Sequence, residues 1–287
     1  MNKHMKKILI TYILVTTLTN LFGQHNKQVT KEQLELFKKS TTYVVMDDNQ
    51  MLGYNITIQA AVKKFWTITP YKFVSSNEFE TLRMNRNNSF ILLTKVKLTK
   101  ETTGAEYLFL NMLMGDSVKD INDMPEILEL PLCYNGVDEN SYVYKMGIIV
   151  RFAQEHVKTL MSALFLWTYR NMTYYNLDIR DIKKKTLLVE SGDLSEDVNT
   201  LDKIKPYYPF DVRIVTRDVI ANAVDKQLPN TLILQVVNPG KDDAVGRSYK
   251  IIYGVDDNKM YYYNFEKISG KSPAGFLIKD FQRIAGT

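Results

Sequence analysis

Cysteine and histidine are scarce in this chain, which has 287 residues, one cysteine and three histidines. The single cysteine, Cys133, allows no internal disulfide. His4 and His25 lie near the amino terminus, which leaves one usable histidine, His156, beside the one cysteine, too few ligands for an ordinary zinc site. A nucleophilic pair of Cys133 and His156 is the arrangement that remains. The apolar run Leu130-Pro131-Leu132 directly before Cys133 instead favours a buried, inert thiol.

Glycine-based motifs for phosphates and nucleophiles are missing as well. The sequence contains no Gly-x-Gly pair and no Gly-x-Ser-x-Gly elbow, which excludes the dinucleotide fingerprint and the usual serine-hydrolase turn. Gly270-Lys271-Ser272 matches only the end of a P-loop, because Phe265 stands where that motif needs its first glycine. We therefore predict no cofactor and no metal site. Three acidic pairs lie in predicted turns without the spacing of a calcium loop, namely Asp47-Asp48, Asp242-Asp243 and Asp256-Asp257.

The amino terminus has the order of residues that is typical of a secretory signal peptide. Three lysines precede an apolar stretch at residues 8–22, and the small residue Gly23 follows it. The stretch is shorter than the roughly 20 residues of a membrane-spanning helix. The Phe-Gly-Gln ending resembles signal peptides of Gram-negative bacteria. We expect residues 1–23 to be removed and the protein to be exported, to the periplasm or alternatively to the extracellular space.

Charge argues against nucleic acid as a partner. Removal of the three lysines of residues 1–23 lowers the formal net charge from +5 to +2. Nucleic-acid binding needs a basic face that displaces counterions, and a nearly neutral chain does not supply it. Lys183-Lys184-Lys185 is predicted to be a solvated turn rather than a binding patch.

Two halves of the chain repeat one pattern in the same order, which predicts a tandem duplication. Each match is short, and the spacing between partners drifts slowly, as insertions would cause. The matching segments are residues 42–45 with 186–189, 72–77 with 213–218, 88–93 with 230–235, 107–110 with 249–252, and 146–151 with 274–279.

Each repeat is predicted to have the element order β-α-β-α-β-β-β-α, so the chain is predicted to be an α/β protein of two tandem related units. Amphipathic patterns predict helices at residues 56–66 and 195–204, and Ser75 and Thr216 are expected to cap the next helices. Apolar residues at three- and four-residue steps predict one long helix at residues 147–176 that joins the units. The expected organisation is a signal peptide at 1–23, a first α/β unit at 24–150, the connecting helix at 151–178 and a second α/β unit at 179–287.

The order of elements also carries a family resemblance. A strand and an amphipathic helix precede a strand with a hydroxyl and acid cap, Ile214-Val215-Thr216-Arg217-Asp218, and then a buried strand, Thr231-Leu232-Ile233-Leu234. This pattern resembles the small α/β domain of periplasmic TolB-type proteins and of CsgG-type envelope assembly factors. The chain lacks the propeller repeats of the former and the lipobox cysteine of the latter. The resemblance implies a non-catalytic module of the cell envelope that binds other proteins.

Clustered tyrosines are the candidate binding surface. Tyr207, Tyr208, Tyr261 and Tyr263 combine an apolar ring with a polar tip, which suits protein and glycan surfaces. The alternative, which we favour, is that alternate tyrosines of a strand face the core while their neighbours face water.

Three functions fit the sequence. We favour a non-enzymatic periplasmic binding or scaffolding protein whose partners are envelope proteins. The first alternative is a glycan- or small-ligand-binding protein that uses the groove between the repeats, since domain junctions often form pockets. The second is a carboxylate-based hydrolase, in which Glu190 or Asp193 at a strand end would act.

Overall fold

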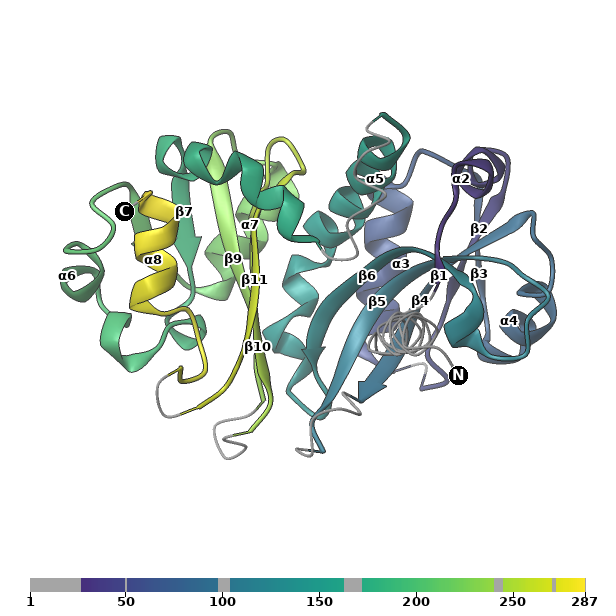
Figure 1. Cartoon of the computed structure of the whole chain (residues 1–287), viewed down its shortest axis with the longest axis horizontal. Coiled ribbons are helices and arrows are strands. Elements are labelled where there is room, and N and C mark those ends of the chain that lie inside the picture. Colours follow the sequence, from purple (N-terminus) through teal and green to yellow (C-terminus); the bar gives the residue numbers. More distant parts are fainter. Residues whose placement is uncertain are drawn as a thin grey trace, which may run out of the picture.

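Strands and helices alternate along both halves of the chain (Figure 1). The structure is a computed structural model that describes residues 27–49, 51–97, 104–162, 172–239, 245–269 and 272–286. The first half contains β1 (Lys27–Gln28), α2 (Lys31–Phe37), β2 (Thr41–Val45), α3 (Gly53–Phe65), β3 (Tyr71–Val74), α4 (Ser76–Leu82), β4 (Asn88–Lys97), β5 (Glu106–Met114), β6 (Pro125–Tyr134) and α5 (Met146–Ser162). The second contains β7 (Thr186–Val189), α6 (Leu201–Ile204), β8 (Val212–Ile214), α7 (Arg217–Lys226), β9 (Thr231–Val237), β10 (Arg247–Gly254), β11 (Met260–Lys267) and α8 (Ile278–Ala285).

The two sheets have the same topology, which confirms an α/β protein of two related units. The first sheet has the strand order β1-β6-β5-β4-β2-β3 and the second has the order β11-β10-β9-β7-β8. In the first sheet, β2 is parallel to β3 and β4, and β5 is antiparallel to β4 and β6. In the second sheet, β7 is parallel to β8 and β9, and β10 is antiparallel to β9 and β11. The added strand β1 is short. The predicted signal peptide at residues 1–23 lies outside the described residues.

Helix starts follow local chemistry. The hydroxyl of Ser75 accepts a hydrogen bond from the backbone N–H of Glu78, whose carboxylate returns to Ser75, so the predicted cap of α4 is a full capping box. Thr216 holds the equivalent position before α7 without a side-chain cap bond. The predicted helix at residues 195–204 is instead a short 3₁₀ turn, Glu196–Val198, followed by α6.

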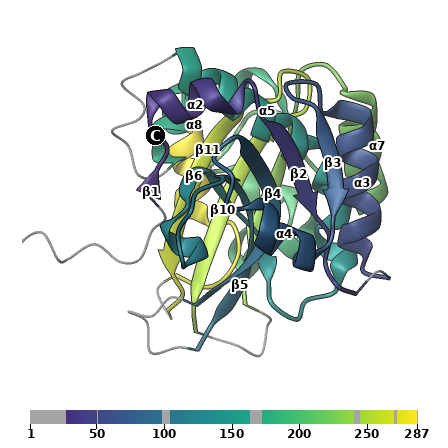
Figure 2. The same cartoon turned by 90° about the vertical axis from the view of Figure 1, so that its right-hand side faces the viewer.

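Helices cover both faces of each sheet, and the two units lie side by side with helices between their sheets (Figures 1 and 2). In the second unit, α6 and α8 pack on the outer face and α7 on the face toward the first unit. In the first unit, α3 and α5 face the second unit, and α4 packs on the far side. The face of the first sheet that carries α5, the closing helix of the first unit, therefore meets the face of the second sheet that lies opposite α8, the closing helix of the second unit.

The largest hydrophobic core belongs to both units. It contains Val44 and Ile91 of the first sheet, and Ile233 and Tyr253 of the second, together with residues of α3, α5 and α7. Two smaller cores lie under α6 and α8 and under α4. A shared core of this kind couples the units, because neither unit can bury these side chains alone.

The long helix was predicted correctly at its start and wrongly at its end. Helix α5 spans Met146–Ser162, and Met172–Lys184 form a 3₁₀ helix, while residues 163–171 lie outside the described part. The 3₁₀ segment is held by side-chain contacts that the apolar pattern does not report. The side-chain amide of Asn176 pairs with the backbone N–H and C=O of Tyr263 on the edge strand β11. Within the described residues, no helix is both long and apolar enough to cross a membrane.

An aromatic contact crosses the junction of the two units. The rings of Tyr107 in β5 and Tyr249 in β10 lie with their centroids 5.4 Å apart.

Arg151 of α5 ties the first unit to the second. The residue is 4% exposed, and its guanidinium stacks on the ring of Phe65 at 4.6 Å. It donates hydrogen bonds to the carbonyl oxygens of Val224 at 2.9 Å and Val255 at 3.3 Å, and to Asn258 Oδ1 at 2.7 Å. Burial lowers the pKa of Arg151 to about 10, so the side chain is still charged at neutral pH.

We expect Arg151→Met to lower the free energy of unfolding by about 3 kcal/mol, because each buried carbonyl that loses its donor costs roughly 1–3 kcal/mol. Lys158→Met on the same helix is the control. Lys158 is 59% exposed and pairs with Glu155, so its loss should cost less than about 0.5 kcal/mol. Urea unfolding of both variants measures the difference, and equal losses would contradict the role assigned to Arg151.

Candidate functional site

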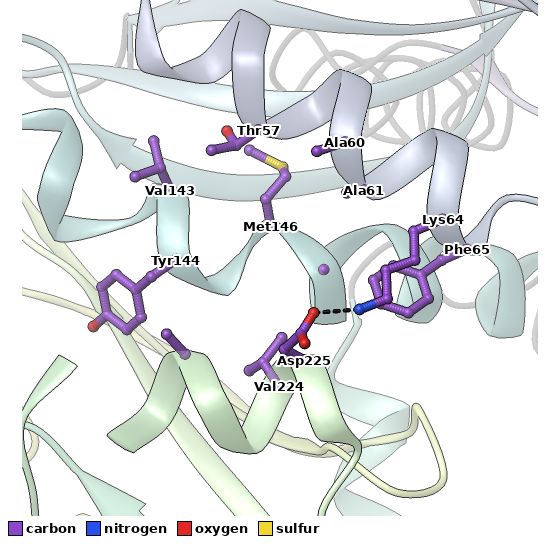
Figure 3. Close-up of a pocket in the computed structure, with 12 residues that line it drawn as sticks. Thr57, Ala60, Ala61, Lys64, Phe65, Val143, Tyr144, Met146, Val224 and Asp225 are labelled. Atoms are coloured by element: carbon purple, nitrogen blue, oxygen red, sulfur yellow. Dashed lines mark hydrogen bonds and ion pairs between the residues drawn. The ribbon is translucent and has the colours of Figure 1, made fainter. Parts of the chain in front are cut away.

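A pocket of about 230 Å³ lies at the junction of the two units (Figure 3). Helix α3 forms one wall, α7 forms the other, and the start of α5 with the preceding 3₁₀ turn, Val143–Lys145, forms the floor. Most of the surface is apolar. The lining residues are Thr57, Ala60, Ala61, Lys64, Phe65, Val143, Tyr144, Met146, Gly147, Ala221, Val224 and Asp225.

Small residues keep this space open. Ala60 and Ala221 face the pocket from opposite walls. At Gly147, an added Cβ would lie 3.1 Å from Val224 Cγ1 and 3.2 Å from a ring carbon of Phe65. The absence of a side chain at Gly147 therefore permits the close approach of α5 to both walls. The hydroxyl of Thr57 donates to the Gly53 carbonyl oxygen within its own helix, which leaves the nearby surface apolar.

One ion pair crosses the pocket mouth. Lys64 of α3 contacts Asp225 of α7, so the cation comes from the first unit and the anion from the second (Figure 3). The two side chains are 51% and 65% exposed. Hydrogen bonding to Lys64 lowers the pKa of Asp225, which keeps that carboxylate ionised. An exposed pair of this kind contributes little stability, and its members are available to another partner.

A polar cluster lies beyond the opposite end of the pocket, at the carboxyl end of β7. It consists of Tyr144, Lys145, Glu190, Asp193 and Arg217. The Tyr144 hydroxyl donates to Glu190 at 2.8 Å, and Arg217 donates to the same carboxylate at 2.9 Å. Lys145, only 2% exposed, pairs with Asp193 at 3.1 Å. Burial raises the pKa of Asp193 despite this lysine.

The two acids of the hydrolase hypothesis are thus brought together, with partners from the first unit. Glu190 and Asp193 bind consecutive residues of one turn, Tyr144 and Lys145. The arrangement is suited to joining the units.

Cys133 and His156 are buried in separate surroundings. Burial and the nearby Glu139 carboxylate raise the pKa of the Cys133 thiol to about 12, against the hydrogen bond with Tyr142, so the thiolate is scarce at neutral pH. His156 Nε2 lies 2.9 Å from the carbonyl oxygen of Ile127. A carbonyl only accepts, so Nε2 carries the proton. The other ring nitrogen, Nδ1, accepts from the Tyr175 hydroxyl at 2.9 Å.

The predicted tyrosine surface was wrong. Tyr208, Tyr261 and Tyr263 are 0%, 5% and 7% exposed, and Tyr207 is partly buried against the core of the second unit. Helices or the first unit cover both faces of the second sheet, so alternation along β11 does not expose either set. A register shift opposite β10 leaves Tyr261 without a ladder partner and turns it and Tyr262 toward the same core.

Charged clusters elsewhere also serve structural contacts. Lys250 is fully buried on the outer face of the second sheet and pairs with Asp280 and Glu266. Asp280 also accepts from the Tyr262 hydroxyl at 2.6 Å and from the Leu277 N–H at 3.0 Å, which fixes the start of α8. A buried charge needs such partners to offset its lost hydration.

The acidic pairs and the P-loop fragment of the sequence have ordinary surroundings where they are described. Asp256 and Asp257 both pair with Lys185 at 2.8 Å. Asp47 accepts from the Asn49 N–H at 2.9 Å, as turn residues do. Asp242-Asp243 and Gly270-Lys271 lie outside the described residues. Among the residues that are described, no group of three or more histidine, cysteine or acidic side chains is placed to hold a metal.

The buried state of His156 makes stability depend on pH. Burial lowers its pKa from 6.5 to about 4. The unfolded chain therefore binds more protons between these values, and stability falls as the pH drops from about 6.5 to 4. The full effect is about 3 kcal/mol. We expect His156→Gln to flatten this part of the curve of unfolding free energy against pH. A curve as steep as that of the unaltered chain would show that other groups cause the loss.

No model of a known protein family, no curated protein and no solved structure matches the chain at a significant level. The resemblance to TolB-type and CsgG-type domains therefore stays a prediction from the order of elements.

Proposed function

We propose that the chain is a non-enzymatic binding protein of the cell envelope, in which the junction of the two units holds the ligand. The observation that carries this proposal is the composition of the junction pocket, whose walls come one from each unit. Ligand sites are commonly concave, mostly apolar and located between domains, with a few polar groups that set orientation. Lys64 and Asp225 are such groups.

The surroundings of the pocket support binding rather than chemistry. Its acid, Asp225, has a lowered pKa and is exposed, whereas a general acid or base near neutral pH needs a raised one. The acids with buried partners, Glu190 and Asp193, are joined to Tyr144 and Lys145. The apolar lining also favours an apolar group over a glycan, whose hydroxyls need many hydrogen-bonding partners.

The envelope setting rests on the sequence. The signal-peptide pattern at residues 1–23 and the resemblance to periplasmic α/β modules both predict export to the periplasm. The predicted partners are envelope proteins. On this proposal, the pocket would be open to periplasmic ligands.

A scaffolding role is the second candidate, and exposed apolar residues beside the pocket favour it. Ile56 is 63% exposed one turn before Ala60 on α3, and Met51 before the same helix is 85% exposed. Side chains of this kind near a pocket are typical of protein contacts. On this candidate the pocket would receive a side chain of an envelope protein.

We expect Ala221→Trp to abolish ligand binding, because the indole would fill the pocket from the α7 wall. Asn222→Trp is the matched control, since Asn222 is the exposed neighbour on the same helix and does not line the pocket. A panel of aliphatic and aromatic fragments should raise the melting temperature of the unaltered chain and of Asn222→Trp, and leave that of Ala221→Trp unchanged. If no fragment raises it, or if Ala221→Trp responds equally, the pocket is not the binding site.

Crosslinking and recovery from the envelope of the host separates the two candidates. The scaffolding role predicts a defined set of envelope proteins that is recovered with the unaltered chain and lost with Ile56→Asp. Recovery at background level, together with fragment binding, leaves the small-ligand role.

A further inference from the structure

We propose that the ligand of the junction pocket is a small zwitterion of the amino-acid type, with one apolar side chain, one ammonium and one carboxylate. The inference rests on the proposed function and specifies its ligand. Three features of the pocket carry it: its size, its apolar floor, and the pair of opposite charges, Lys64 and Asp225, among the described residues that line it.

The size of the pocket suits one side chain. An apolar cavity of roughly 150 Å³ takes up a benzene molecule, and sites for drug-sized ligands begin at about 300 Å³. The junction pocket, at about 230 Å³, lies between these values. It can therefore enclose an aromatic ring or a branched aliphatic group.

The floor and walls suit an apolar side chain. Val143 and Met146 lie at the floor, and Ala60 and Val224 lie on opposite walls (Figure 3). Met146 is unbranched and adapts its shape to different apolar groups. Burial of an aromatic or aliphatic group here is favourable by the hydrophobic effect, in proportion to the apolar area removed from water.

The charges at the mouth match a zwitterion. Lys64 can donate to a carboxylate and Asp225 can accept from an ammonium. The carboxylate of a ligand that carries both groups would take the place of Asp225 beside Lys64, and its ammonium would take the place of Lys64 beside Asp225. Because both side chains are more than half exposed, separating them costs little. The bound molecule would then be held by one charged group from each unit.

The other cations near the mouth do not line the pocket. The guanidinium of Arg151 stacks on Phe65, itself a lining residue, and donates to two carbonyl oxygens and to Asn258. Lys63 lies over the ring of Phe73 at 5.6 Å, and Lys226 follows Asp225 on α7; neither lines the pocket. Among the described residues that line the pocket, Lys64 is the one cation and Asp225 the one anion, which favours a ligand with no net charge.

Calorimetry with three related probes tests the inference. L-phenylalanine carries both charges, 3-phenylpropionate lacks the ammonium, and phenethylamine lacks the carboxylate. We expect L-phenylalanine to bind at least about tenfold more tightly than either single-charge analogue, because a hydrogen bond to a charged group contributes roughly 1.5–3 kcal/mol. Equal affinities for the three probes would overturn the inference.

Two charge-removing variants make the test specific. Lys64→Gln should weaken L-phenylalanine and 3-phenylpropionate about tenfold and leave phenethylamine unchanged. Asp225→Asn should weaken L-phenylalanine and phenethylamine and leave 3-phenylpropionate unchanged. Lys63→Gln is the matched control and should leave all three affinities unchanged. A uniform loss in Lys64→Gln and Asp225→Asn would show that the ion pair only joins the two helices, and it would contradict the inference.

The failure of this inference is distinguishable from the failure of the proposed function. If neutral fragments bind in a manner that Ala221→Trp abolishes while L-phenylalanine gains nothing from its charges, the pocket binds ligands and the zwitterion is wrong. If no probe binds the unaltered chain, both proposals are wrong. Urea unfolding of Lys64→Gln and Asp225→Asn confirms that each variant is folded before its affinity is measured.

Discussion

Helix α5 is buried between two sheets, and this constraint governs the rest of the molecule. Eleven of its 17 residues are buried, on more than one side of the helix. A helix that belonged to the first unit alone would show an apolar stripe toward one sheet and a polar face to water. Here the second face packs against α7 and the second sheet, as the contact of Phe152 with Tyr253 shows. The two units are therefore halves of one hydrophobic core.

This shared core explains why the junction can hold a defined pocket. A groove between two loosely linked domains would change its width as they moved. In this protein, Arg151 joins α5 to the second unit on one side, and the polar cluster of Tyr144, Lys145, Glu190, Asp193 and Arg217 joins it on the other. The pocket lies between these two sets of contacts, and Gly147 permits the close packing of its floor. The packing of the two units fixes the positions of α3 and α7, so the walls of the pocket form without a ligand.

The sequence reveals the repeated elements because strand and helix patterns are local. The element order, the strand at Thr186–Val189 and the capping box at Ser75 all follow from short stretches of residues. The end of α5 could not be predicted in this way. The segment Met172–Lys184 is shaped by Asn176 on the edge of β11 and by tyrosines around His156, which are contacts between distant parts of the chain.

The candidate site was less predictable than the fold. A groove between the repeats was among the hypotheses, but the residues that line it are small or apolar and have no motif. Ala60, Gly147 and Ala221 matter for the space that they leave, which only the packed structure shows. The clustered tyrosines suggested a binding surface that the structure does not have, because alternation along a strand exposes residues only when one face of the sheet is open to water. Here both faces are covered.

Native-state hydrogen exchange tests the central claim that the two units form one cooperative body. The slowest amides of β4 in the first sheet and of β9 in the second should open with the same free energy and the same dependence on denaturant, because both require loss of the shared core. If the amides of one sheet exchange with a clearly lower free energy than those of the other, that unit opens alone. The shared core would then not join the units, and the junction pocket would not be a fixed site.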